Sequence, residues 1–133
     1  MIRRGVRRIN AGDIGPMLSS FANDATLVFP GEHSWGGEYR GKPQIEKFLR
    51  RFVEVGIRLE PHEILVQGWS WKTTVMLRFT NEARDANGNV VYANRGAIFA
   101  QAAWGKITHQ EDYEDTQKVV AFDKYLASQQ THA

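Results

Sequence analysis

Hydrophobic residues recur at helical spacing in the first part of the chain. Residues 2–10 place apolar side chains on one face and arginines on the other, which predicts an amphipathic helix with a solvated basic side. A second, short helix is predicted from apolar positions three and four residues apart, namely Ile14, Met17, Leu18 and Phe21. A third should begin at Gly41-Lys42-Pro43, because proline is favoured in the first helical turn, and end at Gly56.

The second half of the chain reads as strands. Four segments rich in β-branched and aromatic residues predict them: Leu59–Gln67, Ser70–Glu82, Val90–Ala103 and Lys106–Glu114. Asn87-Gly88 predicts a hairpin turn, Gly68 and Gly105 mark the other reversals, and a final helix should start after Asp115. We expect an α+β fold in which a curved antiparallel sheet and three to four helices form a cone with an internal pocket.

A glycine-rich loop follows a short predicted strand, Ala25–Phe29, and holds the first candidate site residues. Because glycine lets the backbone fold back closely, this loop can form one wall of a cavity. We expect Phe29, Trp35 and Tyr39 to contact an apolar or aromatic ligand. His33 is either a participant in acid–base chemistry near neutral pH or an exposed bystander.

The amino-acid composition excludes several functional classes for this protein. A length of 133 residues suits a single domain spanning residues 1–133. A net charge of +2 does not indicate a nucleic-acid surface, and the absence of cysteine excludes disulfides and thiolate chemistry. The four histidines lack the spacing of a metal site, so we expect neither metal nor cofactor. With no long apolar run, we expect a cytoplasmic protein without a membrane partner.

The strands predicted at Ser70–Glu82 and Val90–Ala103 have no plainly polar face. The helices can cover only one face of the sheet, so the other should pack on a second copy of the chain. A symmetric homodimer through the outer sheet face is the simplest prediction, and His109 points to that face. Trp69, Trp71 and Trp104 are expected to be packing residues.

Nearly the whole chain resembles the ketosteroid isomerase, nuclear transport factor 2 and SnoaL-like superfamily. Five pieces carry the resemblance by their order and spacing: N10-A-G-D-I14, F21-A-N-D-A-T-L-V-F29, E38-Y-R-G-K42, W104-G-K-I107 and D112-Y-E-D-T116. The resemblance implies the cone fold, an apolar pocket and usually a homodimer. It does not imply a reaction, because the fold supports several.

The catalytic residues of the best-known relatives are largely missing here. Ketosteroid isomerases place a general-base aspartate where this chain has Phe29, and their oxyanion-hole tyrosine and aspartate would fall near Gly5 and Ala97. Members resembling limonene epoxide hydrolase use two aspartates flanking an arginine. Asp112 matches one of these carboxylates, whereas Met76 and Arg78 lie near the positions of the other two groups.

The strand parity that the resemblance implies gives the remaining candidates. Residues expected to face the pocket are Met76, Arg78, Arg95, Ala97, Phe99, Gln110, Asp112 and Glu114. Arg95 and Asp112 are either a catalytic acid–base group with its orienting cation or a structural ion pair. One hypothesis is a small enzyme of cyclase, isomerase or hydrolase type that acts on an apolar cyclic metabolite, using Asp112, Arg95 and His33. The other is a non-catalytic module that binds a hydrophobic ligand.

Overall fold

The computed structural model describes residues 2–131; Met1, His132 and Ala133 lie outside this range. Ten elements follow one another: α1 (Ile2–Asn10), α2 (Gly15–Ser19), β1 (Phe21–Phe29), β2 (Gly37–Arg40), α3 (Gly41–Glu54), β3 (Arg58–Trp69), β4 (Lys72–Arg84), β5 (Val90–Ala103), β6 (Lys106–Glu114) and α4 (Thr116–Thr131). The α+β prediction is confirmed, and β5 and β6 have the predicted bounds.

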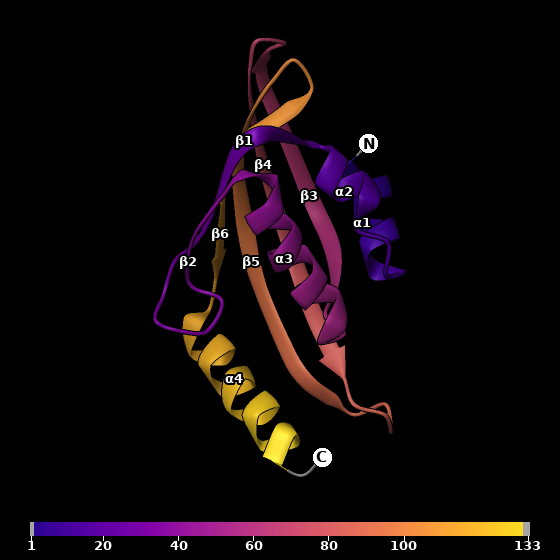
Figure 1. Cartoon of the computed structure of the whole chain (residues 1–133). Helices are drawn as coiled ribbons and strands as arrows, with labels where there is room; N and C mark the ends of the chain where they lie inside the picture. The colour runs from indigo at the N-terminus through magenta and orange to yellow at the C-terminus, as the bar shows by residue number, and fades with distance from the viewer. Residues whose placement is uncertain (1, 132–133) are drawn as a thin grey trace.

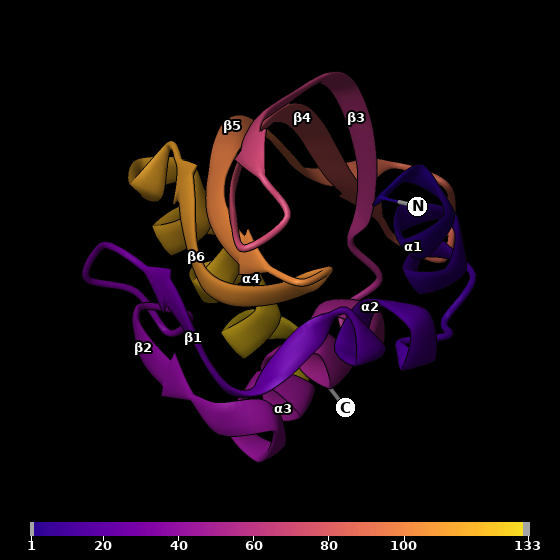
Figure 2. The same cartoon turned by 90° about the horizontal axis from the view of Figure 1, so that it is seen from above.

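The strands form one six-stranded sheet in the order β2-β1-β6-β5-β4-β3. Strands β3 to β6 are the predicted antiparallel meander. β1 runs parallel to β6, so the sheet is mixed and not wholly antiparallel. Figures 1 and 2 show the long strands curving around the helices without closing into a barrel.

The opening strand is longer than predicted. β1 begins at Phe21, which the sequence pattern places in a helix, and the expected loop contains strand β2 paired with β1. Phe21 lies opposite Ile107 of β6, and the Ile107 N–H donates to the Ser20 carbonyl oxygen at 2.8 Å. Pairing with a strand far along the chain therefore outweighs local apolar spacing here.

Helices cover the concave side of the sheet (Figure 1). α3 packs Ile45, Phe48 and Leu49 into the core. α1 is held to β3 by Asn10, whose side chain donates to the Leu59 carbonyl at 2.8 Å and accepts the Leu59 N–H at 2.9 Å. The arginines of α1 are exposed, as predicted.

The register of the meander corrects the expected orientation of five residues. In β4, Leu77 and Phe79 are buried, whereas Met76 and Arg78 are exposed on the outer face. Directly paired residues share a face, and Phe99, Ala97 and Arg95 pair with Met76, Arg78 and Thr80. Met76, Arg78, Arg95, Ala97 and Phe99 therefore do not face the pocket. The larger apolar side chains of β4 turn inward, because burying them gains the most free energy.

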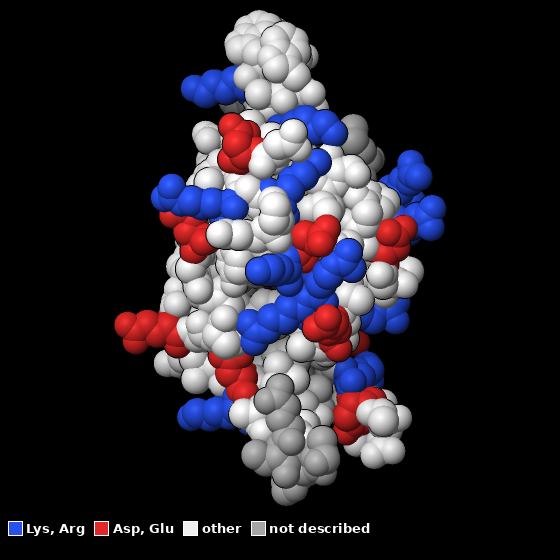
Figure 3. Space-filling view, viewed as in Figure 1, with Lys and Arg blue, Asp and Glu red and all other residues white. Residues whose placement is uncertain are grey.

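Three tryptophans that were expected to be packing residues lie on the surface instead. Trp69, Trp71 and Trp104 are 70%, 59% and 73% exposed, at the tips of the β3–β4 and β5–β6 hairpins. Trp69 and Trp71 stack with ring centroids 5.8 Å apart, and the Trp104 N–H donates to the Ser70 carbonyl. Figure 3 shows an uncharged knob at this end of the molecule, above a surface of mixed charges.

The helices described here are all too short or too polar to cross a lipid bilayer.

Candidate functional site

Asp112 is the buried carboxyl group on the concave face of the sheet. It lies near the C-terminal end of β6 opposite Ile98 of β5 and is 7% exposed. Burial raises the pKa of Asp112 from 3.8 to about 7; the hydrogen bond from Gln110 lowers it, and the nearby Glu114 raises it. A carboxyl group with this pKa has both protonation states available near neutral pH, as acid–base chemistry requires.

The immediate partner of Asp112 is Gln110, two residues earlier on the same face of β6. The Gln110 amide donates to Asp112 Oδ1 at 2.9 Å. This is the one hydrogen bond to the Asp112 carboxyl group among the described residues, so Oδ2 is not consumed by the protein. The expected pairing with Arg95 does not occur, because Arg95 is exposed on the opposite face.

Asp112 lines a narrow, mostly apolar cavity of about 40 Å³ between the sheet and the helices. The lining residues are Phe29, Trp35, Phe48, Phe52, Ile57, Leu59, Phe79, Asn81, Tyr92, Ile98, Asp112, Glu114, Val119 and Phe122. Pockets that hold drug-sized molecules usually measure about 300–1,000 Å³. In this structure aromatic side chains fill most of the cone, and a cyclic ligand could enter only if some of them moved.

A second polar group at the cavity is built around Glu114. Glu114 Oε1 accepts hydrogen bonds from the Asn81 amide at 2.7 Å and from the Tyr92 hydroxyl at 3.0 Å. The Asn94 amide in turn donates to the Tyr92 oxygen at 2.9 Å. Burial raises the pKa of Glu114, whereas these two hydrogen bonds lower it.

Gly96 of β5 lets Glu114 reach Asn81 across an intervening strand. It pairs with Glu114 on one side and with Phe79 on the other. A Cβ atom at Gly96 would lie 2.1 Å from the Tyr113 carbonyl oxygen and 2.8 Å from Glu114 Cγ, which is closer than real Cβ contacts. The bare backbone at this position leaves room for the Glu114 side chain to lie over β5.

His33 is engaged within its own loop. Its Nε2 lies 2.9 Å from the Pro30 carbonyl oxygen, and its Nδ1 accepts the Trp35 N–H at 3.2 Å. A carbonyl oxygen can only accept and an N–H can only donate, so these contacts require the neutral ring with its proton on Nε2. His33 also packs edge-on against Phe29, with ring centroids 4.7 Å apart. Both ring nitrogens are thus used to shape the loop.

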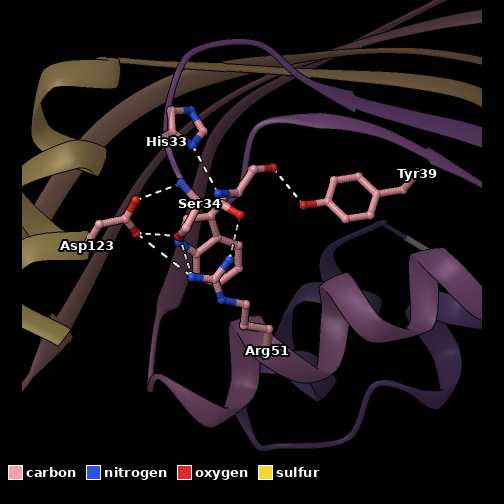
Figure 4. Close-up of polar contacts among 6 residues, drawn as sticks. His33, Ser34, Tyr39, Arg51 and Asp123 are labelled. Atoms are coloured by element: carbon pink, nitrogen blue, oxygen red, sulfur yellow. Dashed lines mark hydrogen bonds and ion pairs between the residues drawn. The ribbon is translucent and has the colours of Figure 1, made fainter. Parts of the chain in front are cut away.

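Figure 4 shows how the same loop is fastened to the helices. The Ser34 N–H and hydroxyl both donate to the Asp123 carboxylate of α4, at 2.7 and 2.5 Å. Arg51 of α3 donates to the Ser34 carbonyl at 3.0 Å and also to its hydroxyl oxygen. The Arg51 guanidinium lies 3.9 Å from the centre of the Trp35 ring, a cation–π contact. The loop is therefore held over the cavity by residues of two helices.

Trp35 and Tyr39 belong to the core more than to an open ligand surface. Trp35 is 3% exposed and meets Phe48 edge-on, with centroids 5.7 Å apart. The Tyr39 hydroxyl donates to the Trp35 carbonyl at 2.7 Å, and its ring packs on Phe48. Burial is the main cause that raises the pKa of the Tyr39 phenol. Trp35 nevertheless lines the cavity, so a ligand in the cone would touch it.

The structure brings together only part of the expected set. Phe29, Trp35, Asp112 and Glu114 line the cavity, and Gln110 lies beside Asp112. His109 is on the outer face as expected, with Nδ1 2.5 Å from the Thr26 hydroxyl. No cluster of three or more His, Asp or Glu that could hold a metal ion occurs within the described part of the chain.

Asn81 and Tyr92 are polar cavity residues that the sequence reasoning missed. The signal was present in β4, where Leu77 and Phe79 form a more apolar row than Met76 and Arg78 and so mark the inward face. Asn81 continues that inward row. For β5 no such signal exists, because both rows mix apolar and polar residues.

Comparisons with known proteins agree with this geometry. A family model described as a SnoaL-like domain matches residues 2–110. An NTF2-like protein of unknown function from Burkholderia pseudomallei superposes with a TM-score of 0.75 at 18% identity, over 92% of this chain and 93% of that one. A candidate polyketide cyclase from Xanthomonas campestris has a TM-score of 0.64 at 22% identity, over 90% and 91%.

A further solved structure is TerC, crystallised with polyporic acid. It has a TM-score of 0.72 at 27% identity, over 90% of this chain and 94% of TerC. No curated protein matches the sequence. Because the family model spans most of the residues and the solved structures share the fold, this chain belongs to the SnoaL-like family and has the NTF2-like fold.

Proposed function

We propose that this protein is a small enzyme that uses Asp112 for acid–base chemistry on an apolar cyclic metabolite bound in the cone. The observation that carries the proposal is the Asp112 carboxyl group itself. It is buried at an apolar cavity, has a pKa raised to about 7 and receives a hydrogen bond from Gln110. Burying a carboxyl group away from water costs folding free energy. Groups buried at such a cost are concentrated at functional sites.

The Asp112 carboxyl group can both remove a proton from the ligand and return one to it, so the reaction needs no other acid or base. Its ionised form takes a proton from the ligand, and the resulting carboxylic acid returns a proton at a second position. Isomerisation and ring closure both fit this scheme. Gln110 acts as a positioning residue, because its hydrogen bond to Oδ1 orients Oδ2 as the free proton acceptor.

Similarity to TerC supports a small-molecule ligand. TerC was crystallised with polyporic acid. It is 27% identical to this chain in an alignment that covers 90% of this chain. The apolar lining here, with Phe29, Trp35, Phe48 and Phe122, is the kind of surface that binds ring systems.

The proposal is tested in two stages. A thermal-shift screen of apolar cyclic compounds, polyporic acid included, should identify ligands that raise the melting temperature. Any ligand that the wild type converts is then given to Asp112→Asn. We expect the variant to bind the ligand within a few-fold of wild type but to lose at least about a hundredfold in kcat. Turnover that survives the substitution would refute the role of Asp112.

A second candidate function is a non-catalytic module that holds a hydrophobic ligand in the same cone. It is favoured by His33, whose two ring nitrogens are both occupied in the loop, so that this imidazole is not free to exchange protons with Asp112. In that case ligands found by the screen should bind and be recovered unchanged.

A further inference from the structure

Asn81 carries a buried side-chain oxygen that none of the described residues satisfies. The side chain is 6% exposed and lines the cavity, and its Oδ1 has no hydrogen-bond donor among the described residues. Leaving a buried polar atom unpaired costs about 1–3 kcal/mol. Such an atom at a cavity wall suggests that its partner is supplied from the cavity.

The orientation of the Asn81 amide follows from its neighbours. Its Nδ2 donates to Glu114 Oε1 at 2.7 Å, and the Tyr92 hydroxyl donates to the same oxygen at 3.0 Å. Burial and the nearby Glu114 raise the pKa of the Tyr92 phenol, so the hydroxyl keeps its proton. When Glu114 is ionised, its Oε1 can only accept hydrogen bonds. Exchanging the amide N and O of Asn81 would set two acceptors against each other, so Nδ2 is the atom bonded to Glu114 and Oδ1 is the atom left without a donor.

The other polar groups at this end of the cavity also present oxygens. Asp112 receives its hydrogen bond on Oδ1, and Glu114 receives both of its bonds on Oε1. The second oxygen of each carboxyl group is not bonded to any described residue. A carboxyl group can donate when it is protonated, whereas Asn81 Oδ1 can only accept. Asn81 Oδ1 therefore matches a hydroxyl or N–H group and not a carbonyl or ether oxygen.

We propose that the cone selects cyclic ligands that carry a hydroxyl or N–H group and that this donor bonds to Asn81 Oδ1. The inference rests on the proposed function, because it assumes that an apolar cyclic ligand enters the cone. Beyond the proposed function, it specifies that the ligand carries a hydrogen-bond donor and that Asn81 is the residue that recognises this donor.

A structural water is the competing partner for Asn81. The cavity of about 40 Å³ is large enough to hold a water molecule. The ligand's donor would have to replace that water, so the decisive comparison is between two ligands of similar shape of which only one can donate.

The experiment uses 2-naphthol and 2-methoxynaphthalene as probes, with binding measured by calorimetry on the full chain. Wild type should bind the naphthol about tenfold more tightly, as expected for one buried hydrogen bond. Asn81→Leu should bind the two probes within about threefold of each other. Asn94→Leu is the control, because Asn94 lies on the same face but bonds to Tyr92 and the Asp115 carbonyl, and it should keep the preference.

The outcomes separate the two proposals. Equal binding of both probes by wild type overturns the role of Asn81 and leaves an apolar ligand site standing. Binding of neither probe counts against the apolar site and the inference together. If Asn81→Leu or the control fails to fold, the wild-type preference still decides, together with a crystal structure of the naphthol complex. A water retained on Asn81 Oδ1 in that complex would also overturn the inference.

Discussion

Asp112 is the residue on which the functional account depends. Its carboxyl group is buried against apolar side chains with Gln110 as hydrogen-bond donor, and burial is the main cause of its raised pKa. In the unfolded chain the same group would ionise near 3.8. The protein therefore gives up some stability at neutral pH to keep this group in the cone, as active sites commonly do.

This cost can be measured as a pH dependence of stability. Because the folded pKa of Asp112 is about 7 and the unfolded value 3.8, the native state binds more protons between these limits. The free energy of unfolding should thus fall as pH rises from about 4 to about 7, by on the order of 3 kcal/mol. Asp112→Asn should lack this fall and be more stable than wild type above pH 7.

Urea denaturation from pH 4 to pH 8 provides the measurement, with Glu111→Gln as control. Glu111 is the next residue back along β6 but lies on the outer face. The control should keep the wild-type pH dependence. A pH dependence shared by wild type and Asp112→Asn would contradict the raised pKa.

Trp35 and Trp71 offer a matched pair of tryptophans. Trp35 is buried against Phe48 and Arg51, whereas Trp71 is exposed at a hairpin tip. Trp35→Ala should destabilise the protein by about 3–5 kcal/mol, and Trp71→Ala by less than about 1 kcal/mol. Equal losses in urea denaturation would contradict the core assignment of Trp35.

At the scale of elements, the loop between β1 and β2 is the segment most closely tied to the cavity. Its backbone is fixed by His33, and Ser34 joins it to α3 and α4 through Arg51 and Asp123. The loop carries Trp35 into the core, so any widening of the cavity on this side involves these contacts.

Two neighbouring arginines on α3, Arg50 and Arg51, allow the fastening of the loop to be distinguished from a general effect of surface charge. Arg51→Ala removes the Trp35 contact and the bonds to Ser34, and should cost about 1–3 kcal/mol and speed amide exchange at Trp35. Arg50 pairs only with the exposed Glu46 among the described residues, so Arg50→Ala should cost less than about 0.5 kcal/mol. If amide exchange at Trp35 is unchanged in Arg51→Ala, the loop is held by other contacts.

The sequence predicted the elements better than their faces. Hairpin turns, glycines and the stripe of α3 sufficed to place the meander and the helices, because these signals are local. Strand parity depends on register between strands, and β5 offers no local signal for it, because both of its rows mix apolar and polar residues. Arg95 was therefore assigned to the wrong face, while Asp112 and Glu114 were placed correctly.

At the scale of the whole molecule, none of the described helices covers the outer face of the sheet. Leu65, Met76 and Tyr113 are exposed there at 59%, 40% and 48%, and Phe99 lies between them on β5. We expect this face to pack against a second copy in a symmetric homodimer.

Sedimentation velocity tests this prediction. Wild type should sediment as a dimer at micromolar concentration, and Met76→Lys should shift it towards monomer by burying an unpaired charge. Lys118→Glu, an exposed change on α4, should leave the dimer intact. A clean wild-type monomer would contradict the proposed interface.

NMR tests most directly whether the buried Asp112 carboxyl group has a raised pKa inside the cone. The ¹³Cγ chemical shift of Asp112, followed from pH 3 to pH 9 in ¹³C-labelled protein, reports the ionisation of this one group without any substrate. We expect the titration of Asp112 to have its midpoint near pH 7. A midpoint near 4, the ordinary value for aspartate, would contradict it.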